Sequence, residues 1–361
     1  MIIGEADRSF LPFDAAIICF KYRLHCQPDT FTMEVGFDQQ IYKRQRLGGI
    51  SRYFSDLAKS LRAEGITTHT GKRINWINAE IVHATFYSGA PYSLSESQIL
   101  VSSLFDMIPE KHPEYFPLSK LYSPHRNKKK WLKQSNLIIS ISDSSSDDLE
   151  FFYPKLNTNI RRIHLSTSIQ TTVAVPVKCL NEMDYFLYVG KRAGYKNGTI
   201  LFQALSLIKR GLTNSKHIPF IVFAGGGEFS NKEKKMIEEN NLTNHLMQIN
   251  VDDHKLSWLY KNAKACLVPS IAEGFSLPLI ESLVLNTPLA ASDIEVHKEV
   301  SKGFSTLISS NNAKDWAEFL LNRNLQRPKN MLGSEYNSQC LYFSASRLAK
   351  EHIKAYIDCQ Y

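Results

Sequence analysis

The sequence predicts an α/β protein made of two Rossmann-like domains that face each other across a cleft. Short apolar runs, each the length of a buried strand, alternate with amphipathic helical segments. A polar stretch at residues 168–184 interrupts this alternation, which then starts again and so divides the chain into two series. At 361 residues, the chain is long enough for two domains with separate cores.

The first series begins at Met33, where residues 33–38 have the pattern of a first strand. Gly48 and Gly49 then open an amphipathic helix that ends at Gly65. A glycine pair at a helix start lets a phosphate approach the backbone closely, although such a pair can equally form a plain turn. Further buried strands are expected at 79–84, 99–104 and 137–142.

Residues 1–32 contain apolar side chains without a clear order of strand, loop and helix. We expect them to be an extension, or to precede a translation start at Met33; an extra strand or helix is an equal alternative. The remaining boundaries follow from the linker. The N-terminal Rossmann-like domain is expected over 33–172 and the C-terminal one over 173–340, followed by a last helix within 341–361.

Two carboxylates, Glu273 and Glu281, stand with seven residues between them, around a Gly-Phe-Ser-Leu-Pro turn. An apolar strand precedes the turn, and Pro278 suits the first turn of the helix that follows. In open parallel sheets ligands bind at the carboxyl ends of strands, and a helix N-terminus suits a phosphate. The alternative is a surface loop whose acids only cap a helix.

Two other segments are expected at the same edge of the second sheet. A basic loop with Arg192 and Lys196 follows the strand at 185–190, and the glycines 225–227 follow the strand at 219–224. The two cations would neutralise a diphosphate. This convergence, more than any single motif, predicts a site for a nucleoside diphosphate.

Composition limits the classes of partner. The net charge of +8 suits anionic substrates or an anionic membrane surface, and we expect no nucleic-acid partner. The six cysteines form no Cys-x-x-Cys pair, which is typical of a reducing compartment. No apolar run reaches the roughly 18 residues of a membrane-spanning helix. A cytoplasmic location is therefore expected.

The stretch Lys120–Lys133 is rich in lysine and arginine and contains Trp131. No acidic residue occurs between Glu114 and Asp143. A basic surface helix with aromatic side chains suggests contact with anionic lipid headgroups at the inner face of the plasma membrane. The alternative is an ordinary solvated helix face.

Several motifs, in this order, resemble those of the retaining glycosyltransferases of family 4, which have the GT-B fold. They are Gly48–Phe54, Tyr188–Gly190 with Arg192 and Lys196, Gly225–Gly227, the Glu273/Glu281 pair, and Ser292–Ile294 up to Glu299. The resemblance covers most of the chain from Met33 onward. It is closest to bacterial O-antigen and surface-polysaccharide mannosyltransferases, to which His83–Tyr87 and Asp106–Glu110 are also similar.

The resemblance implies roles for individual residues. Arg192 and Lys196 would hold the donor diphosphate in place of a metal ion, Glu281 would bind the ribose, and Glu273 would face the transferred sugar. The catalytic residues would therefore be Glu273, Arg192 and Lys196. The other donor-binding residues would be Gly48, Gly49, Gly190, Gly226, Phe275, Ser276, Leu277 and Glu281. Asp106, Arg52 and His83 would bind the acceptor, and the C-terminal helix would cross back to the N-terminal domain.

The chain departs from the family pattern at two positions. Phe105 stands where many relatives have a histidine before the aspartate that matches Asp106. Ser276 replaces the second glycine of the usual Glu-Gly-Phe-Gly turn, and serine does not tolerate the freest turn conformations. These departures bear on sugar contacts and turn geometry, not on the family.

The expected activity is transfer of a hexose, with retention of configuration, from a nucleotide sugar to a lipid-linked polysaccharide or oligosaccharide. GDP-mannose is the expected donor, and no separate cofactor is expected. Two alternatives stay open: a UDP-sugar-dependent transferase of the same fold, and a protein that binds a nucleotide sugar without turnover.

Overall fold

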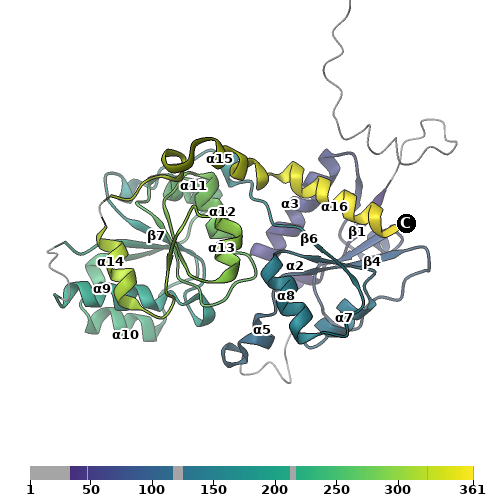
Figure 1. Ribbon diagram of the computed structural model, residues 1–361, viewed down its shortest axis with the longest axis horizontal. Coiled ribbons are helices and arrows are strands. Elements are labelled where there is room, and N and C mark those ends of the chain that lie inside the picture. The colour runs from purple at the N-terminus through teal and green to yellow at the C-terminus, as the bar shows by residue number, and fades with distance from the viewer. Residues whose placement is uncertain (1–32, 47, 117–124, 212–216, 323, 361) are drawn as a thin grey trace, which may run out of the picture. The chain divides into compact units, whose positions relative to one another are not determined.

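The computed structural model describes residues 33–46, 48–116, 125–211, 217–322 and 324–360, and it confirms two Rossmann-like halves (Figure 1). The expected extension over residues 1–32 lies outside the described residues. Residues Glu34–Tyr361 form one compact unit. The domain boundaries expected above remain predictions.

The N-terminal lobe is built on a six-stranded parallel sheet with the strand order β2-β1-β3-β4-β5-β6. The strands are β1 (Glu34–Phe37), β2 (Thr67–His69), β3 (Ile81–Ala84), β4 (Ile99–Leu104), β5 (Leu137–Ser140) and β6 (Asn159–Arg162). Every residue of β3, β4 and β5 is buried, as expected for central strands covered on both faces. Its helices are α2 (Gln40–Arg44), α3 (Gly49–Ala63), α4 (Arg73–Trp76), α5 (Ile108–Lys111), α7 (Lys128–Gln134) and α8 (Asp143–Phe152).

The C-terminal lobe repeats the plan with a second six-stranded parallel sheet in the order β12-β11-β10-β7-β8-β9. The strands are β7 (Phe186–Val189), β8 (Ile221–Ala224), β9 (Leu246–Ile249), β10 (Cys266–Val268), β11 (Leu289–Ser292) and β12 (Thr306–Ile308). Its helices are α9 (Thr199–Lys209), α10 (Asn231–Glu239), α11 (Asp253–Asn262), α12 (Leu277–Val284), α13 (Glu295–Ser301), α14 (Ala313–Leu321) and α15 (Pro328–Tyr342). Strands and helices thus alternate, which puts the loops after the strands at one edge of the sheet.

The last helix, α16 (Ala345–Gln360), crosses back to the N-terminal lobe and packs along α3, as expected (Figure 1). A buried polar network secures it. The Tyr356 hydroxyl lies 2.8 Å from His83 Nδ1, and His352 Nε2 lies 2.8 Å from the Tyr53 hydroxyl. Burial lowers the pKa of His352 to about 4, so this network is uncharged at neutral pH.

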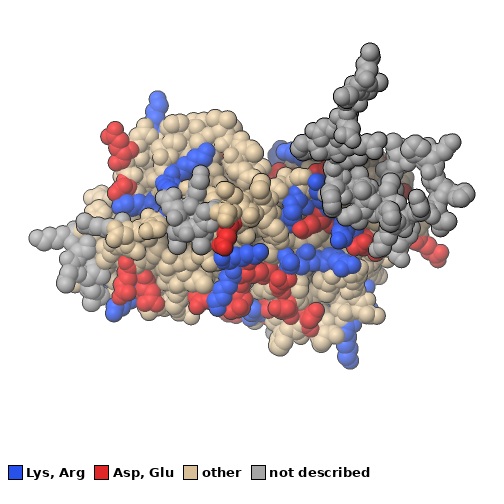
Figure 2. Space-filling view, turned by 45° about the horizontal axis from the view of Figure 1, so that its top comes forward, with Lys and Arg blue, Asp and Glu red and all other residues tan. Residues whose placement is uncertain are grey.

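Among the described residues, no helix is both long enough and apolar enough to cross a membrane. Basic and acidic side chains lie interspersed on the face of the molecule shown in Figure 2.

Candidate functional site

The site is organised around the turn between β10 and α12. Pro278 lies in the first turn of α12, where its missing N–H costs no hydrogen bond. Ser276, just before the helix, has a φ of 83°, in the region that favours glycine. Its hydroxyl is buried and, within the described part of the chain, has no hydrogen-bond partner. Strain of this kind together with an unpaired polar atom is characteristic of ligand-binding turns.

Glu273 is held at the start of this turn by two neighbours. The Lys196 ammonium lies 2.7 Å from each of its carboxylate oxygens, and the Ser270 hydroxyl donates to Oε1 at 2.7 Å. The Glu273 side chain is 7% exposed, whereas that of Lys196 is 31% exposed. The lysine therefore keeps a solvent-facing side through which an anion could contact it.

Glu281 lies one helical turn into α12 and is buried. The Tyr260 hydroxyl donates to Oε2 at 2.8 Å, and Arg52 Nη1 from the N-terminal lobe lies 3.5 Å from Oε1. Burial raises the pKa of Glu281 above its usual value, although Arg52 and Tyr260 act in the opposite direction. Arg52 also pairs with Asp253. A small cavity beside Glu281 is lined from both lobes, by Arg52, Tyr53, Asp56, Leu277 and Glu281 among others.

Arg192 is buried among protein groups that accept its hydrogen bonds. Its guanidinium is buried and pairs with Glu233 of α10, with Nε 2.7 Å from Oε1. It also donates to the carbonyl oxygens of Gly227 and Glu228, at 3.0 and 2.8 Å. Although burial raises the pKa of Glu233, the hydrogen bond from Arg192 holds it below its usual value, so this ion pair is charged at neutral pH. These hydrogen bonds hold the glycine loop, residues 225–227, in place.

The glycine loop allows a close approach of two backbone segments. A Cβ on Gly226 would lie 2.3 Å from the carbonyl oxygen of Gly190, so this position admits no larger residue without a shift. Gly190 and Gly226 both have positive φ, at 112° and 73°. The structure thus brings together the ends of β7 and β8, which the sequence places at one edge.

The N-terminal lobe contacts the turn through Gly49 and Asp106. A Cβ on Gly49, at the start of α3, would lie 3.4 Å from Leu277, and Gly48 is the residue that caps α3. Asp106 lies beside Gly274, because a Cβ on that glycine would be 3.1 Å from the aspartate Cβ. Asp106 Oδ1 accepts the N–H of Ile108, so it also caps the turn into α5.

His83 does not join this group. It is fully buried in β3, where its ring nitrogens lie 2.8 Å from the Tyr356 hydroxyl and 2.9 Å from the Ser103 hydroxyl. Burial holds its pKa well below the usual range. Both nitrogens are occupied, so this geometry gives His83 a structural role and leaves it no free atom for an acceptor.

Lys128 was expected on the basic surface, and this expectation is wrong. Its side chain is fully buried and its ammonium lies 2.8 Å from Glu110 Oε2. The ammonium also donates to the carbonyl oxygen of Asp106, so it supports the loop beside the turn. Lys120 lies outside the described residues. The exposed lysines of α7 are Lys129, Lys130 and Lys133.

Sequence reasoning missed the partners that hold the site residues: Ser270, Tyr260 and Glu233. Glu233 had a readable local signal, since Ser230 and Glu233 form a capping box at the start of α10. That signal predicts a helix start, but its pairing with an arginine 41 residues away appears only in the fold. Ser270 and Tyr260 carried no comparable signal.

Comparison with known proteins adds three findings. The profile of the family described as glycosyl transferases group 1 matches residues 179–330. The O-antigen chain mannosyltransferase RfbU of Salmonella typhimurium is 26% identical over 221 residues, which cover 61% of this chain and 59% of that protein. O-antigen chain mannosyltransferase B of Escherichia coli is 24% identical over 197 residues, covering 52% and 51% of the two chains. The chain therefore spans between half and three fifths of the length of these curated relatives.

Solved structures share the fold at low identity. Sucrose-phosphate synthase of Thermosynechococcus elongatus superimposes with a TM-score of 0.70 at 13% identity, over 90% of this chain and 98% of that one. WaaG, a glycosyltransferase involved in lipopolysaccharide biosynthesis, gives a TM-score of 0.60 at 15% identity, over 90% and 99%. HepE of Anabaena, solved in complex with UDP and glucose, gives 0.60 at 13% identity over 90% and 100%.

Proposed function

We propose that this chain, which belongs to the group 1 glycosyltransferases through residues 179–330, is a retaining hexosyltransferase. The donor we propose is GDP-mannose and the acceptor a growing lipid-linked polysaccharide or oligosaccharide. The names of the curated relatives, two O-antigen chain mannosyltransferases, support the sugar and the acceptor class. The contact of Lys196 with Glu273, in the turn before α12, carries the proposal, because a partly exposed cation beside a carboxylate suits a donor's diphosphate and sugar.

The donor is bound mainly by the turn and the first turn of α12. The N–H groups of Phe275, Ser276 and Leu277 and the N-terminus of α12 face the diphosphate, and the unpaired Ser276 hydroxyl adds a donor. Glu281 accepts the ribose hydroxyls, and Glu273 accepts hydroxyls of the hexose. Gly48 and Gly49 let the diphosphate approach from the N-terminal lobe.

Two cations serve this site in different ways. Lys196 neutralises the charge that develops on the departing nucleoside diphosphate. Arg192 acts indirectly, since its guanidinium is hydrogen-bonded to Glu233 and to the carbonyl oxygens of Gly227 and Glu228. We therefore assign Arg192 to positioning Gly226 against Gly190.

The reaction breaks the bond between the hexose C1 and the phosphate oxygen and forms a bond from C1 to an acceptor hydroxyl oxygen. The acceptor's proton goes to the leaving phosphate oxygen on the same face, so configuration is retained. The protein supplies positioning and charge stabilisation rather than a nucleophile. In this proposal Asp106, beside Gly274, and Arg52, beside Glu281, orient the acceptor.

Binding of nucleotides tests the donor. Isothermal titration with GDP, UDP and ADP should give the tightest binding for GDP, and Glu281→Gln should weaken it about tenfold, as expected for a lost charge-assisted hydrogen bond. Tighter binding of UDP than of GDP would indicate a UDP sugar as the donor. The UDP complex of HepE is an example of this alternative. Binding of a nucleotide sugar without any transfer to acceptor-bearing membranes would identify a binding protein instead.

The acceptor we propose is anchored in a membrane, so we also propose a cytoplasmic enzyme that contacts the anionic inner face of the plasma membrane. The exposed lysines of α7 and the exposed ring of Phe151 in α8 support this contact. Lys129 of α7 lies over the ring of Tyr153, the residue that follows α8, with its ammonium 5.2 Å from the ring centroid.

A further inference from the structure

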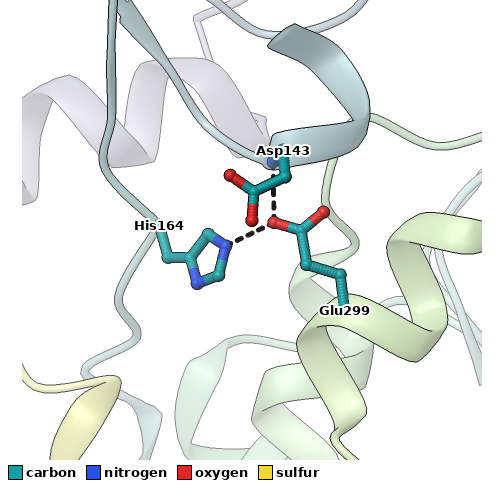
Figure 3. A group of neighbouring side chains, drawn as sticks. All are labelled: Asp143, His164 and Glu299. Atoms are coloured by element: carbon teal, nitrogen blue, oxygen red, sulfur yellow. Dashed lines mark hydrogen bonds and ion pairs between the residues drawn. The ribbon is translucent and has the colours of Figure 1, made fainter. Parts of the chain in front are cut away.

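Glu299 lies outside the donor site, on α13 of the C-terminal lobe, yet its carboxylate binds the N-terminal lobe. Oε1 accepts the backbone N–H of Asp143 at 2.7 Å, and Oε2 accepts that of Ser144 at 3.2 Å. These N–H groups belong to the first turn of α8, where a carboxylate is favoured by the helix dipole. Figure 3 shows Glu299 reaching from α13 to this helix start, with His164 beside it.

His164 extends this contact. Its Nε2 lies 2.6 Å from Glu299 Oε1, and its Nδ1 lies 3.0 Å from the Tyr342 hydroxyl near the end of α15. The ring packs against Phe275, with 5.4 Å between the ring centroids. Phe275 belongs to the donor-binding turn, so a chain of direct contacts runs from Glu299 through His164 to that turn.

A second contact connects the start of α8 with the donor-binding turn. The Ser145 hydroxyl, also in the first turn of α8, donates to the carbonyl oxygen of Gly274 at 3.4 Å. The helix start that binds Glu299 therefore also contacts the residue before Phe275. Gly274 and Phe275 are held by groups of the N-terminal lobe, and Glu299 is the charged group that fastens those groups to the C-terminal lobe.

The three side chains could also suggest a metal site, since one ligand atom from each of Asp143, His164 and Glu299 lies within 4.8 Å of the others. The Arg162 guanidinium already lies beside these side chains. Arg162 Nε lies 2.8 Å from Asp143 Oδ1, and its Nη1 lies 3.2 Å from His164 Nε2. A positive charge at this position opposes a second cation, and both Glu299 oxygens already accept N–H groups.

We propose that Glu299 is a positioning residue that clamps the two lobes together and thereby sets the conformation of the donor-binding turn. Its partners are the first turn of α8 and His164, and it does not itself contact the donor. By linkage, the turn binds the diphosphate tightly only while the clamp is closed, and bound diphosphate in turn favours the closed clamp. This part of the inference rests on the proposed donor site; the clamp itself does not.

Hydrogen exchange measured by mass spectrometry on the nucleotide-free protein tests the clamp alone. Glu299→Gln removes the charge and one acceptor, so the amides of Asp143 and Ser144 should exchange at least tenfold faster, and the peptide covering 271–279 should also lose protection. Glu295→Gln is the matched control, because it is on the same helix and highly exposed. Unchanged exchange at both peptides, or equal effects of the two variants, would overturn the proposal.

Nucleotide affinity tests the coupling. Glu299→Gln should weaken binding of the preferred nucleoside diphosphate about tenfold, His164→Phe should also weaken it, and the double variant should be no weaker than Glu299→Gln alone, because His164 acts on the clamp through Glu299. Additive losses would contradict a single clamp. If wild type binds no nucleotide, the proposed function fails while the exchange result still decides the clamp. Stabilisation of wild type, but not of Glu299→Gln, by Mn²⁺ or Zn²⁺ would overturn it in favour of a metal site.

Discussion

Glu281 combines a cost in stability with a proposed function. It is a buried carboxylate whose pKa is raised by burial, so its ionised form is less favourable in the folded protein than in the unfolded chain. The protonated carboxyl is favoured in the folded protein, so Glu281 contributes its full stabilisation below its ordinary pKa of 4.5. This contribution is lost as the pH rises through the higher pKa of the folded protein. At neutral pH the residue therefore carries a cost in stability, which the proposed ribose contact would account for.

The Glu281→Gln variant should accordingly be more stable than wild type at pH 7 and equal to it near pH 4. The amide keeps an acceptor for the Tyr260 hydroxyl, and Arg52 keeps Asp253 as a partner. Thermal unfolding at the two pH values checks this. A variant that is less stable at pH 7 would show that the ionised carboxylate contributes net stability through Arg52.

At the scale of elements, α16 depends on its buried polar contacts with the N-terminal lobe. Tyr356→Phe removes the hydroxyl that lies 2.8 Å from His83 Nδ1 and leaves this buried nitrogen without its partner. The free energy of unfolding should fall by about 1–2 kcal/mol. Chemical denaturation measures it, and an unchanged value would mean that water replaces the hydroxyl.

Helix α7 allows a direct test of membrane contact. Replacing Lys129, Lys130 and Lys133 by glutamate should abolish binding to vesicles containing phosphatidylglycerol, since each basic side chain near such a surface contributes about 1 kcal/mol. Lys128 is left intact, because its ammonium is buried against Glu110. Lys234 and Lys235 of α10, changed to glutamate, are the control. If both variants bind the vesicles in a flotation assay as wild type does, α7 is an ordinary solvated helix.

The elements that the sequence predicted are those with an apolar signal. The central strands β3, β4, β5, β7, β8 and β10 coincide with apolar runs, because parallel strands covered on both faces need them. Three of the four edge strands, β2, β6 and β12, went unrecognised. They are short and largely exposed, with sequences such as Asn-Ile-Arg-Arg, so only their pairing with a neighbour defines them.

The same distinction applies to the site. The spacing of Glu273 and Glu281 was enough to place both at one strand end and helix start, since both positions follow from local structure. The pairing of Arg192 with Glu233 and the binding of Glu299 to the start of α8 join residues 41 and 156 positions apart. Such pairs depend on how helices of different βα units meet, which a local pattern does not encode.

At the scale of the whole molecule, Gly274 marks a close approach between the lobes. A Cβ at this position would lie 1.8 Å from the carbonyl oxygen of Phe105 in the N-terminal lobe. Gly274→Ala should therefore force the turn and this loop apart, with a loss of about 2 kcal/mol in stability, typical of overpacking. Weaker nucleotide binding should accompany the lower unfolding temperature. An alanine variant with wild-type stability and affinity would show that the lobes separate freely at this point.

Transfer of sugar from a panel of nucleotide sugars to acceptor-bearing membranes tests the central claim most directly, with wild type compared against Glu273→Ala and Lys196→Ala. Lys235→Ala, a change in the exposed face of α10, is the control. The account predicts turnover of GDP-mannose by wild type and control, and a loss of about two orders of magnitude in each of the two site variants. Turnover that survives both site variants, or no turnover of any donor by a protein that binds the nucleotide, would contradict it.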